Sequence, residues 1–211
     1  MGKLLQISNS TIKRITMYYR VLLETRDTHY IRSDEIAKIV GFNPSLVRRD
    51  LMHFSQVGVT GKGYPVNELK SKIVKMLGIE KPSNVAVIGV GNLGTALVNY
   101  RGFHHEGFKI IAAFDIDHRK INRVRNGIPI YGMDSINKIA REKNVKIAII
   151  TVPVRIVQDV VNKVVAAGIK SILNFAPAKV MVPVGVNVLN IDMTVALSRL
   201  SYMTAAQKVL F

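Results

Sequence analysis

The feature that most constrains the fold lies at residues 85–94, where the sequence reads Val-Ala-Val-Ile-Gly-Val-Gly-Asn-Leu-Gly. An apolar, β-prone run breaks there into three glycines with the spacing Gly-x-Gly-x-x-Gly. This spacing is typical of a tight turn from a strand into a helix, where backbone N–H groups and the helix N-terminus approach a pyrophosphate. We therefore expect a dinucleotide to contact the whole loop: Gly89, Val90, Gly91, Asn92, Leu93 and Gly94.

The segment after this loop supports the interpretation. A helix is expected over residues 92–100 and a strand over 108–114, which ends in Asp115, 21 residues past Gly94. An acidic side chain at that point accepts hydrogen bonds from the adenosine ribose, and Asp117 is the alternative partner. Because a carboxylate repels the 2′-phosphate of NADP, NAD is favoured. Three nearby cations keep NADP open at low weight: Arg119, Lys120 and Arg123.

Strands and helices then alternate to residue 191, as expected of a parallel sheet covered on both faces. Thr151 and Asn174 fall at or near carboxyl ends of strands, where such sheets bind ligands. Asn174 is expected either beside the nicotinamide or in a simple turn role. Residues 81–191 are predicted to form a Rossmann-like dinucleotide-binding domain. Its further strands are expected over residues 128–131, 146–152, 171–175 and 186–191, and its further helices over 134–143 and 155–167.

Before the glycine loop the pattern is helical. Apolar residues recur at helical spacing over residues 10–25, and a short second helix starts with Ser33 as its cap. A third helix opens with Asn43 and Pro44 and runs to about residue 54. Two helices joined by a turn of about three residues that contains glycine form a helix-turn-helix.

The third helix is predicted to sort its side chains by face. Two adjacent arginines near the start of such a helix are placed to reach guanine edges or phosphates in a major groove, although a solvated charged face is the alternative. The inward face is predicted to carry Val47, Leu51 and Phe54, and the outward face Ser45, Arg48, Arg49 and Met52.

The glycine-rich segment 55–66 predicts a β-hairpin with a basic tip. A hairpin directly after a recognition helix is a wing, so Lys62 is expected to enter a minor groove or meet a phosphate, and Tyr64 is a further candidate DNA contact. A fourth helix is expected to end at Gly78, before a linker. Residues 1–80 are thus predicted to form a winged helix-turn-helix DNA-binding domain.

Composition narrows the function classes. The chain of 211 residues has no cysteine, which excludes disulfides, thiolate catalysis and cysteine-ligated metals. Its net charge of +16 indicates a polyanionic partner or a basic surface kept for solubility, and the excess is spread over both parts of the chain. No apolar run approaches the roughly 20 residues that span a bilayer. We expect a cytoplasmic protein with no membrane partner.

The tail, residues 192–208, is predicted to be a helix rich in apolar side chains. Such a helix either caps its own domain or packs on a second copy. Because a helix-turn-helix protein that reads a palindrome needs two-fold symmetry, the dimer is favoured. We assign residues 192–211 to dimerisation.

This combination resembles the redox-sensing transcriptional repressor Rex family over nearly the whole chain. Together the motifs are specific, whereas singly only the glycine motif and the Asn-Phe-Ala-Pro segment say much. The resemblance rests on Val47-Arg-Arg-Asp-Leu51, Gly61-Lys-Gly-Tyr64, Val87-Ile-Gly-Val-Gly-Asn-Leu-Gly94, Asn99-Tyr-Arg-Gly-Phe103, Phe114-Asp-Ile-Asp117 and Ile172-Leu-Asn-Phe-Ala-Pro177.

The resemblance implies a homodimer whose terminal helices swap between subunits. It also implies that the protein binds operator DNA when NADH is scarce and releases it when NADH binds. By position, Arg20, Tyr100 and Asp192 match the residues that couple the cofactor to the DNA-binding domain in this family. We call this domain, residues 1–80, the head. The alternatives are a surface residue for Arg20, a core aromatic for Tyr100 and a helix N-cap for Asp192.

The sequence departs from the family pattern at three positions. Leu46 stands where relatives usually carry a polar residue, and Thr60 where many carry arginine in the wing, so the family's operator contacts at these two positions are not carried over to this chain. Met193 stands where an aromatic side chain often meets the nicotinamide.

The chemical task is to distinguish NADH from NAD⁺, which carries one more positive charge on its ring. Burying that cation against apolar side chains without a counter-ion is costly, whereas the neutral dihydro ring has no such penalty. We expect Met193 and the neighbourhood of Phe175 to supply the apolar wall. NADH is then the ligand and NAD⁺ a weaker competitor.

Two other functions remain as alternatives. A small NAD-dependent oxidoreductase would need a catalytic residue over the nicotinamide, but the five histidines all lie in the head or before the later strands. We therefore predict no catalytic residue and no metal site. A CoA-binding module uses a similar glycine loop, and Asp115 argues against it.

Overall fold

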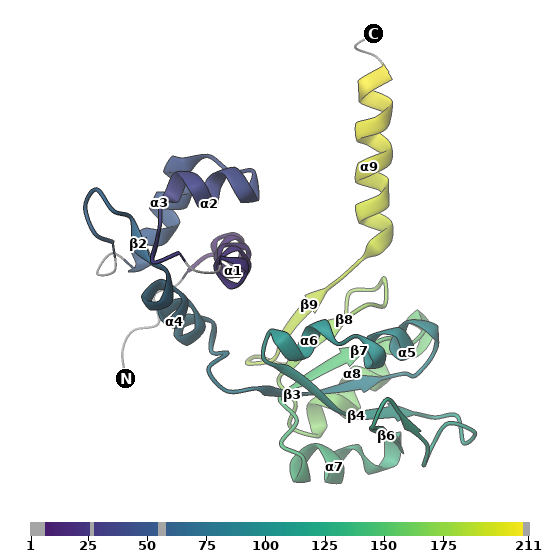
Figure 1. Ribbon diagram of the computed structural model, residues 1–211. Helices are drawn as coiled ribbons and strands as arrows, with labels where there is room; N and C mark the ends of the chain where they lie inside the picture. Colours follow the sequence, from purple (N-terminus) through teal and green to yellow (C-terminus); the bar gives the residue numbers. More distant parts are fainter. Residues whose placement is uncertain (1–6, 26–27, 55–57, 209–211) are drawn as a thin grey trace. The chain divides into compact units, whose positions relative to one another are not determined.

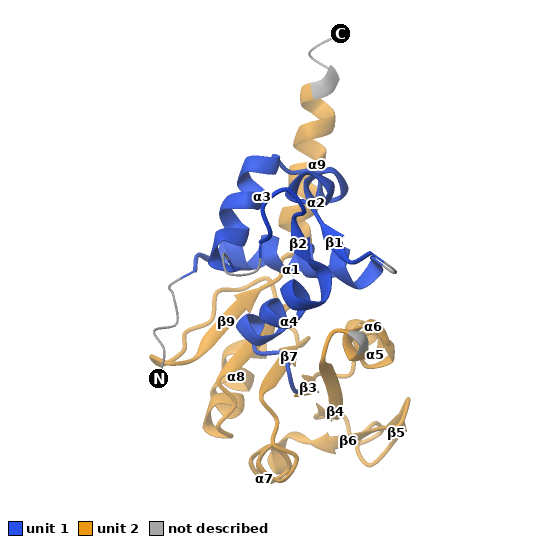
Figure 2. Cartoon of the chain, turned by 60° about the vertical axis from the view of Figure 1, so that its left-hand side comes forward, with its two compact units in different colours: residues 1–81 blue, residues 82–211 orange. Residues whose placement is uncertain are grey.

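The computed structural model describes residues 7–25, 28–54 and 58–208. The chain divides into two compact units, residues 1–81 and residues 82–211 (Figures 1 and 2). The break falls between Lys81 and Pro82, within the linker expected from the sequence.

The first unit is built from helices with one small sheet. Side-chain caps begin two of these helices: the Ser8 hydroxyl accepts a hydrogen bond from the backbone of Thr11, and the Asn43 side chain accepts one from that of Ser45. The elements are α1 (Asn9–Glu24), β1 (Tyr30–Ile31), α2 (Ser33–Val40), α3 (Pro44–Leu51), a 3-10 turn (Met52–Phe54), β2 (Tyr64–Pro65) and α4 (Val66–Leu77).

The predicted cap of α2 is wrong by one residue. Arg32 has the extended backbone of an N-cap, and Ser33 is the first helical residue and is buried. Glu35 explains the shift, because its Oε2 accepts a hydrogen bond from the Arg32 backbone N–H at 2.6 Å. This arrangement satisfies one of the free donors at the helix start without a serine cap.

One apolar core holds the first unit together. The inward face predicted for α3 is confirmed, because Val47, Leu51 and Phe54 are all buried. Helices α1 and α4 supply most of the rest of this core: Ile15, Tyr18, Tyr19, Val21, Leu22, Leu69 and Ile73.

The wing is shorter than expected. Val59 and Gly63 exchange two backbone hydrogen bonds of 2.8 and 3.0 Å around a tight turn, but no longer ladder follows within the described part of this segment. Instead β2 pairs antiparallel with β1, a two-residue strand that the sequence pattern does not indicate. Residues 55–57 of the predicted hairpin lie outside the described part.

The second unit contains a seven-stranded sheet in the order β5-β6-β4-β3-β7-β8-β9. Apart from the antiparallel edge strand β5, the strands run parallel in the 3-2-1-4-5-6 order of a Rossmann fold. The strands are β3 (Ser83–Ile88), β4 (Phe108–Asp115), β5 (Val124–Arg125), β6 (Ile128–Gly132), β7 (Ile147–Ile150), β8 (Ser171–Asn174) and β9 (Asn187–Asn190).

Helices cover both faces of this sheet (Figure 1). Alternate residues of β3 belong to different cores: Ala86 and Ile88 pack with α7 (Ile136–Glu142) and α8 (Val157–Ala166), whereas Val85 and Val87 pack with α5 (Asn92–Asn99). Three short elements complete the domain: α6 (Gly102–His105) and 3-10 turns at Met133–Ser135 and Val154–Ile156.

The chain ends in α9 (Met193–Lys208), whose large apolar side chains face solvent. Each of Met193, Val195, Leu197, Leu200 and Met203 is at least 54% exposed, so the helix does not cap its own domain. Residues 209–211 of the segment assigned to dimerisation lie outside the described part. No helix among the described residues is long and apolar enough to cross a membrane.

Candidate dinucleotide site and DNA-binding face

The carboxyl ends of four parallel strands meet around the glycine loop. The backbone N–H of Gly89 donates to the carbonyl oxygen of Phe114 in β4 at 2.8 Å. The backbone N–H of Thr151 donates to the carbonyl oxygen of Ile88 in β3 at 2.9 Å. Phe175 likewise bonds to Ile150 of β7. The predicted loop, Asp115, Thr151 and Phe175 therefore lie at one edge of the sheet, on both sides of the point where the strand order reverses.

Two of the three loop glycines are required by the protein itself. Gly89 has a φ of +93°, a conformation that favours glycine, and a Cβ there would lie 3.0 Å from the carbonyl oxygen of Thr151. A Cβ on Gly94 would lie 1.9 Å from the carbonyl oxygen of Gly89. Gly94 thus lets the first turn of α5 pack against the end of β3.

The middle glycine has no such requirement. Gly91 has a φ of −78°, and a Cβ there would meet no atom within 4 Å. Gly91 is also the N-cap of α5, and no side chain caps that helix. The missing side chain therefore leaves an open cradle above the free N–H groups of a helix N-terminus, which fits an anionic group such as a pyrophosphate.

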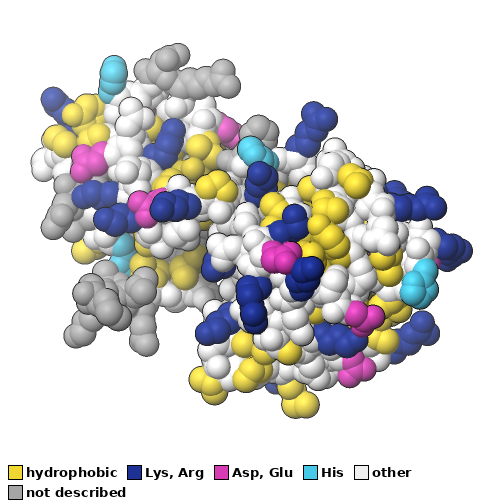
Figure 3. Space-filling model, turned by 90° about the horizontal axis from the view of Figure 1, so that it is seen from below, with side chains coloured by type: hydrophobic (Ala, Val, Ile, Leu, Met, Phe, Trp, Pro, Cys, Tyr) yellow, Lys and Arg dark blue, Asp and Glu magenta, His cyan; other side chains and the backbone are white. Residues whose placement is uncertain are grey.

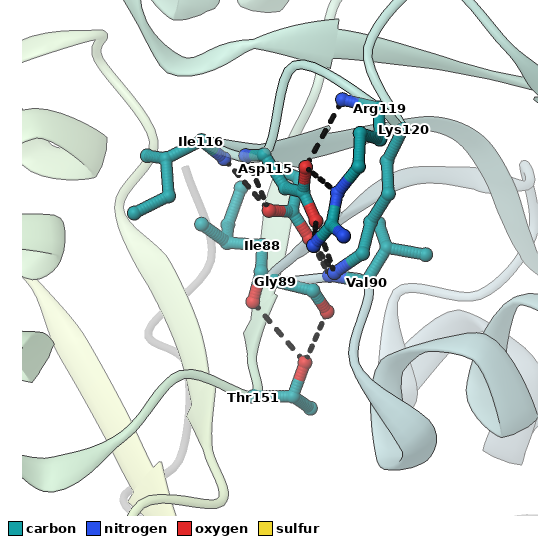
Figure 4. A network of polar contacts seen from close by, with 9 residues as sticks. Ile88, Gly89, Val90, Asp115, Ile116, Arg119, Lys120 and Thr151 are labelled. Atoms are coloured by element: carbon teal, nitrogen blue, oxygen red, sulfur yellow. Dashed lines mark hydrogen bonds and ion pairs between the residues drawn. The ribbon is translucent and has the colours of Figure 1, made fainter.

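The other loop residues differ in what they offer to a ligand. The Val90 side chain is buried in the core, so a ligand can meet only its backbone. Leu93 is partly buried, and Asn92 is exposed at the start of α5. The Thr151 hydroxyl donates a hydrogen bond of 2.7 Å to the carbonyl oxygen of Gly89, which fixes the loop from the neighbouring strand (Figure 4).

Asp115 is tied into the glycine loop from the end of β4. Its Oδ2 accepts hydrogen bonds from the Val90 backbone N–H at 2.8 Å and from the Lys120 Nζ at 3.1 Å (Figure 4). Its Oδ1 accepts the backbone N–H groups of Ile116 and Asp117. Burial disfavours the charge, but these donors outweigh it, so the pKa of Asp115 lies below its usual value. The carboxylate is therefore ionised and fixed in place, as the predicted ribose contact requires.

Two of the three cations that left NADP open, Arg119 and Lys120, are already engaged with acids. Arg119 binds Asp117 through its Nε and Nη2, both at 3.0 Å, and these bonds lower the pKa of Asp117 to about 2. Lys120 lies between Asp115 and Asp117, with its Nζ 3.9 Å from the Asp117 carboxylate. A 2′-phosphate would have to compete with both carboxylates for these groups, which favours NAD as predicted.

Asn174 serves the protein rather than an open site. Its side chain is completely buried, and its amide nitrogen donates to the carbonyl oxygens of Ala176 and Ala178 and to Asn190. Its Oδ1 accepts the backbone N–H of Ala176. Of the two roles expected for Asn174, the turn role describes these contacts, and nothing in the geometry supports a direct nicotinamide contact. The neighbouring Phe175 is half-buried and packs against the sheet.

The three residues expected to couple the two units belong to three different elements. Arg20 is exposed on α1, and Tyr100, the C-cap of α5, is 60% exposed. Asp192 accepts backbone N–H bonds from Thr194 at 2.9 Å and Val195 at 3.2 Å, which is the N-cap geometry that the sequence left open. Met193 follows at the exposed start of α9.

The predicted DNA-binding side chains of α3 lie together on its outer surface. Ser45, Arg48 and Arg49 are exposed, and neither arginine forms an ion pair with another described residue. Burial raises the pKa of Tyr64, and the positive charge of Arg48 opposes the shift. Lys62 lies at the wing turn, 5.9 Å above the Tyr30 ring. Basic side chains are widely spread elsewhere as well (Figure 3).

Sequence reasoning missed the network that fixes α3 in the head. Arg14 of α1 binds both carboxylate oxygens of Asp50 at 2.6 and 2.7 Å, and the Tyr18 hydroxyl donates to Asp50 at 2.8 Å. Burial disfavours the Asp50 charge, but these bonds outweigh it and keep the pKa of Asp50 below its usual value. The sequence signal that could have revealed this network is the position of Asp50, an acidic residue three positions after Val47 on the inward face of a basic helix.

A helix-turn-helix head joined to a dinucleotide-type Rossmann domain defines the class of ligand-responsive transcriptional regulators. Comparison with known proteins agrees for both units. The family described as "Putative DNA-binding protein N-terminus" matches residues 6–51, and the family described as "CoA binding domain" matches residues 80–178.

Whole-length relatives identify the family. The redox-sensing transcriptional repressor Rex of Syntrophobacter fumaroxidans is 41% identical, over 95% of this chain and 97% of its own. The Rex-family repressor RSP, solved with NAD⁺ and operator DNA, is 32% identical over 97% of this chain and 95% of its own, with a TM-score of 0.90. RSP solved with NADH is 30% identical over 97% of both chains, with a TM-score of 0.84.

The chain belongs to the redox-sensing transcriptional repressor Rex family. This membership confirms the predicted fold class, with a DNA-binding head and a Rossmann-like parallel sheet. It also confirms the prediction of a regulator rather than an enzyme, because the relatives are named as repressors.

Proposed function

We propose that this chain binds palindromic operator DNA through α3 and the wing when NADH is scarce, and releases the DNA when NADH binds at the glycine loop. The observation that carries the proposal is the open cradle at Gly91. The fold does not require glycine at this position, whereas the close approach of a pyrophosphate does. The solved complexes of RSP with NAD⁺ and operator DNA, and with NADH, support the same pair of ligands.

Selection of NADH over NAD⁺ follows from the polarity of the wall around the ring. The half-buried Phe175 and the methionine at the start of α9 supply apolar surface, and neither carries a charge to balance a cationic nicotinamide. The oxidised ring therefore loses hydration without a counter-ion, whereas the reduced ring does not. NAD⁺ acts as the weaker competitor.

The functional form is a cytoplasmic homodimer held by residues 192–211. The exposed apolar side chains of α9 need a surface to cover, and their own domain does not provide it. A second copy supplies that surface and the two-fold symmetry of a palindrome. Arg20, Tyr100 and Asp192 couple the cofactor to the head in this dimer.

Fluorescence anisotropy on a palindromic duplex, titrated separately with NADH, NAD⁺ and NADPH, tests the switch. A coupling free energy of roughly 3 kcal/mol corresponds to a loss of operator affinity of about 150-fold with NADH. NAD⁺ and NADPH are expected to have much weaker effects at equal concentration. Equal operator affinity with and without saturating NADH contradicts the proposal.

The two exposed arginines of α3 should contribute separately to operator binding. Arg48→Ala and Arg49→Ala are each expected to weaken it by about 1–3 kcal/mol if the guanidinium reads a base, with relaxed specificity at that position. A loss that is uniform over sequences, with a salt slope smaller by about one, identifies a phosphate contact instead. Lys38→Ala on the neighbouring helix is the matched control, and an arginine variant that binds like it removes that arginine from the DNA face.

The CoA-family match gives a second candidate ligand for the same edge. The ionised Asp115 beside the loop opposes the 3′-phosphate of CoA for the same reason that it opposes NADP. Calorimetric titration with CoA and with NADH distinguishes them, and we expect heat from NADH alone.

A further inference from the structure

The Tyr100 ring rests against the helix that follows it. The ring packs edge-on to Phe103, with 5.0 Å between the ring centroids and an interplanar angle of 81°. Nevertheless 60% of Tyr100 is exposed, so little besides this contact and the adjacent backbone holds the ring in place.

The Tyr100 ring lies against the backbone of Gly102. A Cβ on Gly102 would be 2.5 Å from both Cζ and Oη of Tyr100 and 2.6 Å from its Cε1. The φ of Gly102 is outside the left-handed region, so the backbone itself does not call for glycine. The missing side chain therefore serves the Tyr100 ring.

The obstacle at Gly102 differs in kind from the obstacle at Gly94. At Gly94 a side chain would meet a backbone carbonyl oxygen that cannot move away, whereas at Gly102 it would meet the far end of a flexible side chain. A methyl group at position 102 is thus expected to displace the ring and leave the fold unchanged.

The Tyr100 ring also has room for a second position. It forms part of the lining of an open cavity of about 400 Å³. Apolar side chains that include Val98, Phe108 and Ile128 line this cavity, together with Arg101 and Lys109. A ring displaced from Gly102 can pack on these apolar side chains and keep its hydroxyl in water.

We propose that Gly102 is a positioning residue for the coupling between cofactor and operator, because it provides the resting place for one of two positions of the Tyr100 ring. The inference rests on the proposed function, which gives Tyr100 its coupling role. A coupled switch needs an element with two discrete arrangements that both ligands bias. Removing one arrangement removes the bias without touching either binding site.

A double-mutant cycle on the full-length protein tests this inference. Operator affinity is measured by anisotropy with and without saturating NADH, and the ratio of the two dissociation constants is the coupling factor. Gly102→Ala is expected to lower this factor roughly tenfold, out of the 5–150-fold range typical of such couplings. In a Tyr100→Ala background the same substitution should change nothing, because Gly102 acts only through that ring.

Controls separate this role from general damage. Asn99→Ala, an exposed substitution in the same segment, should keep the wild-type coupling factor, and Gly102→Ala should keep the wild-type melting temperature. Phe103→Leu removes the edge-on contact and provides a second variant that should lower the factor. In protein with labelled tyrosine rings, Tyr100 resonances, assigned with Tyr100→Phe, should lose the ring-current shift from Phe103 in Gly102→Ala.

Each outcome decides the inference. An unchanged coupling factor in Gly102→Ala overturns it, and so does an equal loss in the Tyr100→Ala background. If the wild-type protein itself shows no coupling, the proposed function fails and the inference fails with it. Wild-type coupling with intact coupling in Gly102→Ala removes the inference alone.

Discussion

Gly91→Ala is expected to weaken NADH binding by about 100-fold, roughly 2.7 kcal/mol, and to leave the fold intact. A Cβ at Gly91 meets no protein atom within 4 Å, so the folded state has no reason to change. The same methyl group enters the cradle at the start of α5 and holds a pyrophosphate away from the free N–H groups. Calorimetry with NADH and a thermal melt measure the two effects on the same sample.

Gly94→Ala is the matched control for this prediction. Its Cβ would meet the carbonyl oxygen of Gly89 at 1.9 Å, so α5 must shift from β3 and the melting temperature should fall. The two substitutions add the same methyl group three residues apart, and we expect opposite patterns of stability and binding loss. NADH affinity that is unchanged in Gly91→Ala would show that the cradle is not the pyrophosphate site.

Asp50→Ala is expected to destabilise the head by about 3 kcal/mol, because it leaves the Arg14 guanidinium and the buried Tyr18 hydroxyl without their common acceptor. The Arg14 side chain is 20% exposed, so water relieves part of the loss. Hydrogen exchange of the α3 amides reports the head separately from the second unit, and their protection should fall. Operator affinity should fall with it.

Acid titration gives an independent check on the same network. The pKa of Asp50 is lower in the folded state than its unfolded value of about 3.9. The stabilisation is therefore fully present above pH of about 4 and is lost as the pH falls through the folded pKa. Asp50→Asn should flatten this dependence of stability on pH. Arg49→Ala is the control, because it should weaken DNA binding and leave the hydrogen-exchange protection of α3 unchanged. Equal α3 protection in wild type and Asp50→Ala would show that the network does not hold the helix.

Local patterns accounted for much of the second unit. The glycine loop, the strand before it and Asp115 are set by residues close in sequence, and the parallel order follows from general rules of α/β chains. Asn174 shows the limit of such reasoning. Its position at a strand end was predictable, but its contacts with Ala178 and Asn190 depend on how the following loop folds back.

In the head the unpredicted features are non-local or very short. The Arg14–Asp50 pair joins residues 36 positions apart, and their meeting depends on how α1 crosses α3. Strand β1 has two residues, too few to show a periodicity. The cap of α2 was misplaced because a glutamate side chain reaching back to Arg32 replaced the expected serine oxygen.

The buried cores of the two units share no residue among those described: one draws on residues 15–79 and the other on residues 85–188. An event at the glycine loop therefore cannot reach α3 by side chains rearranging through a common interior. We expect communication between the halves to use groups on their surfaces and motion of each unit as a body, with the internal packing of each core kept. Substitutions in the head can then alter the operator that it recognises without a change in how the second unit binds its ligand.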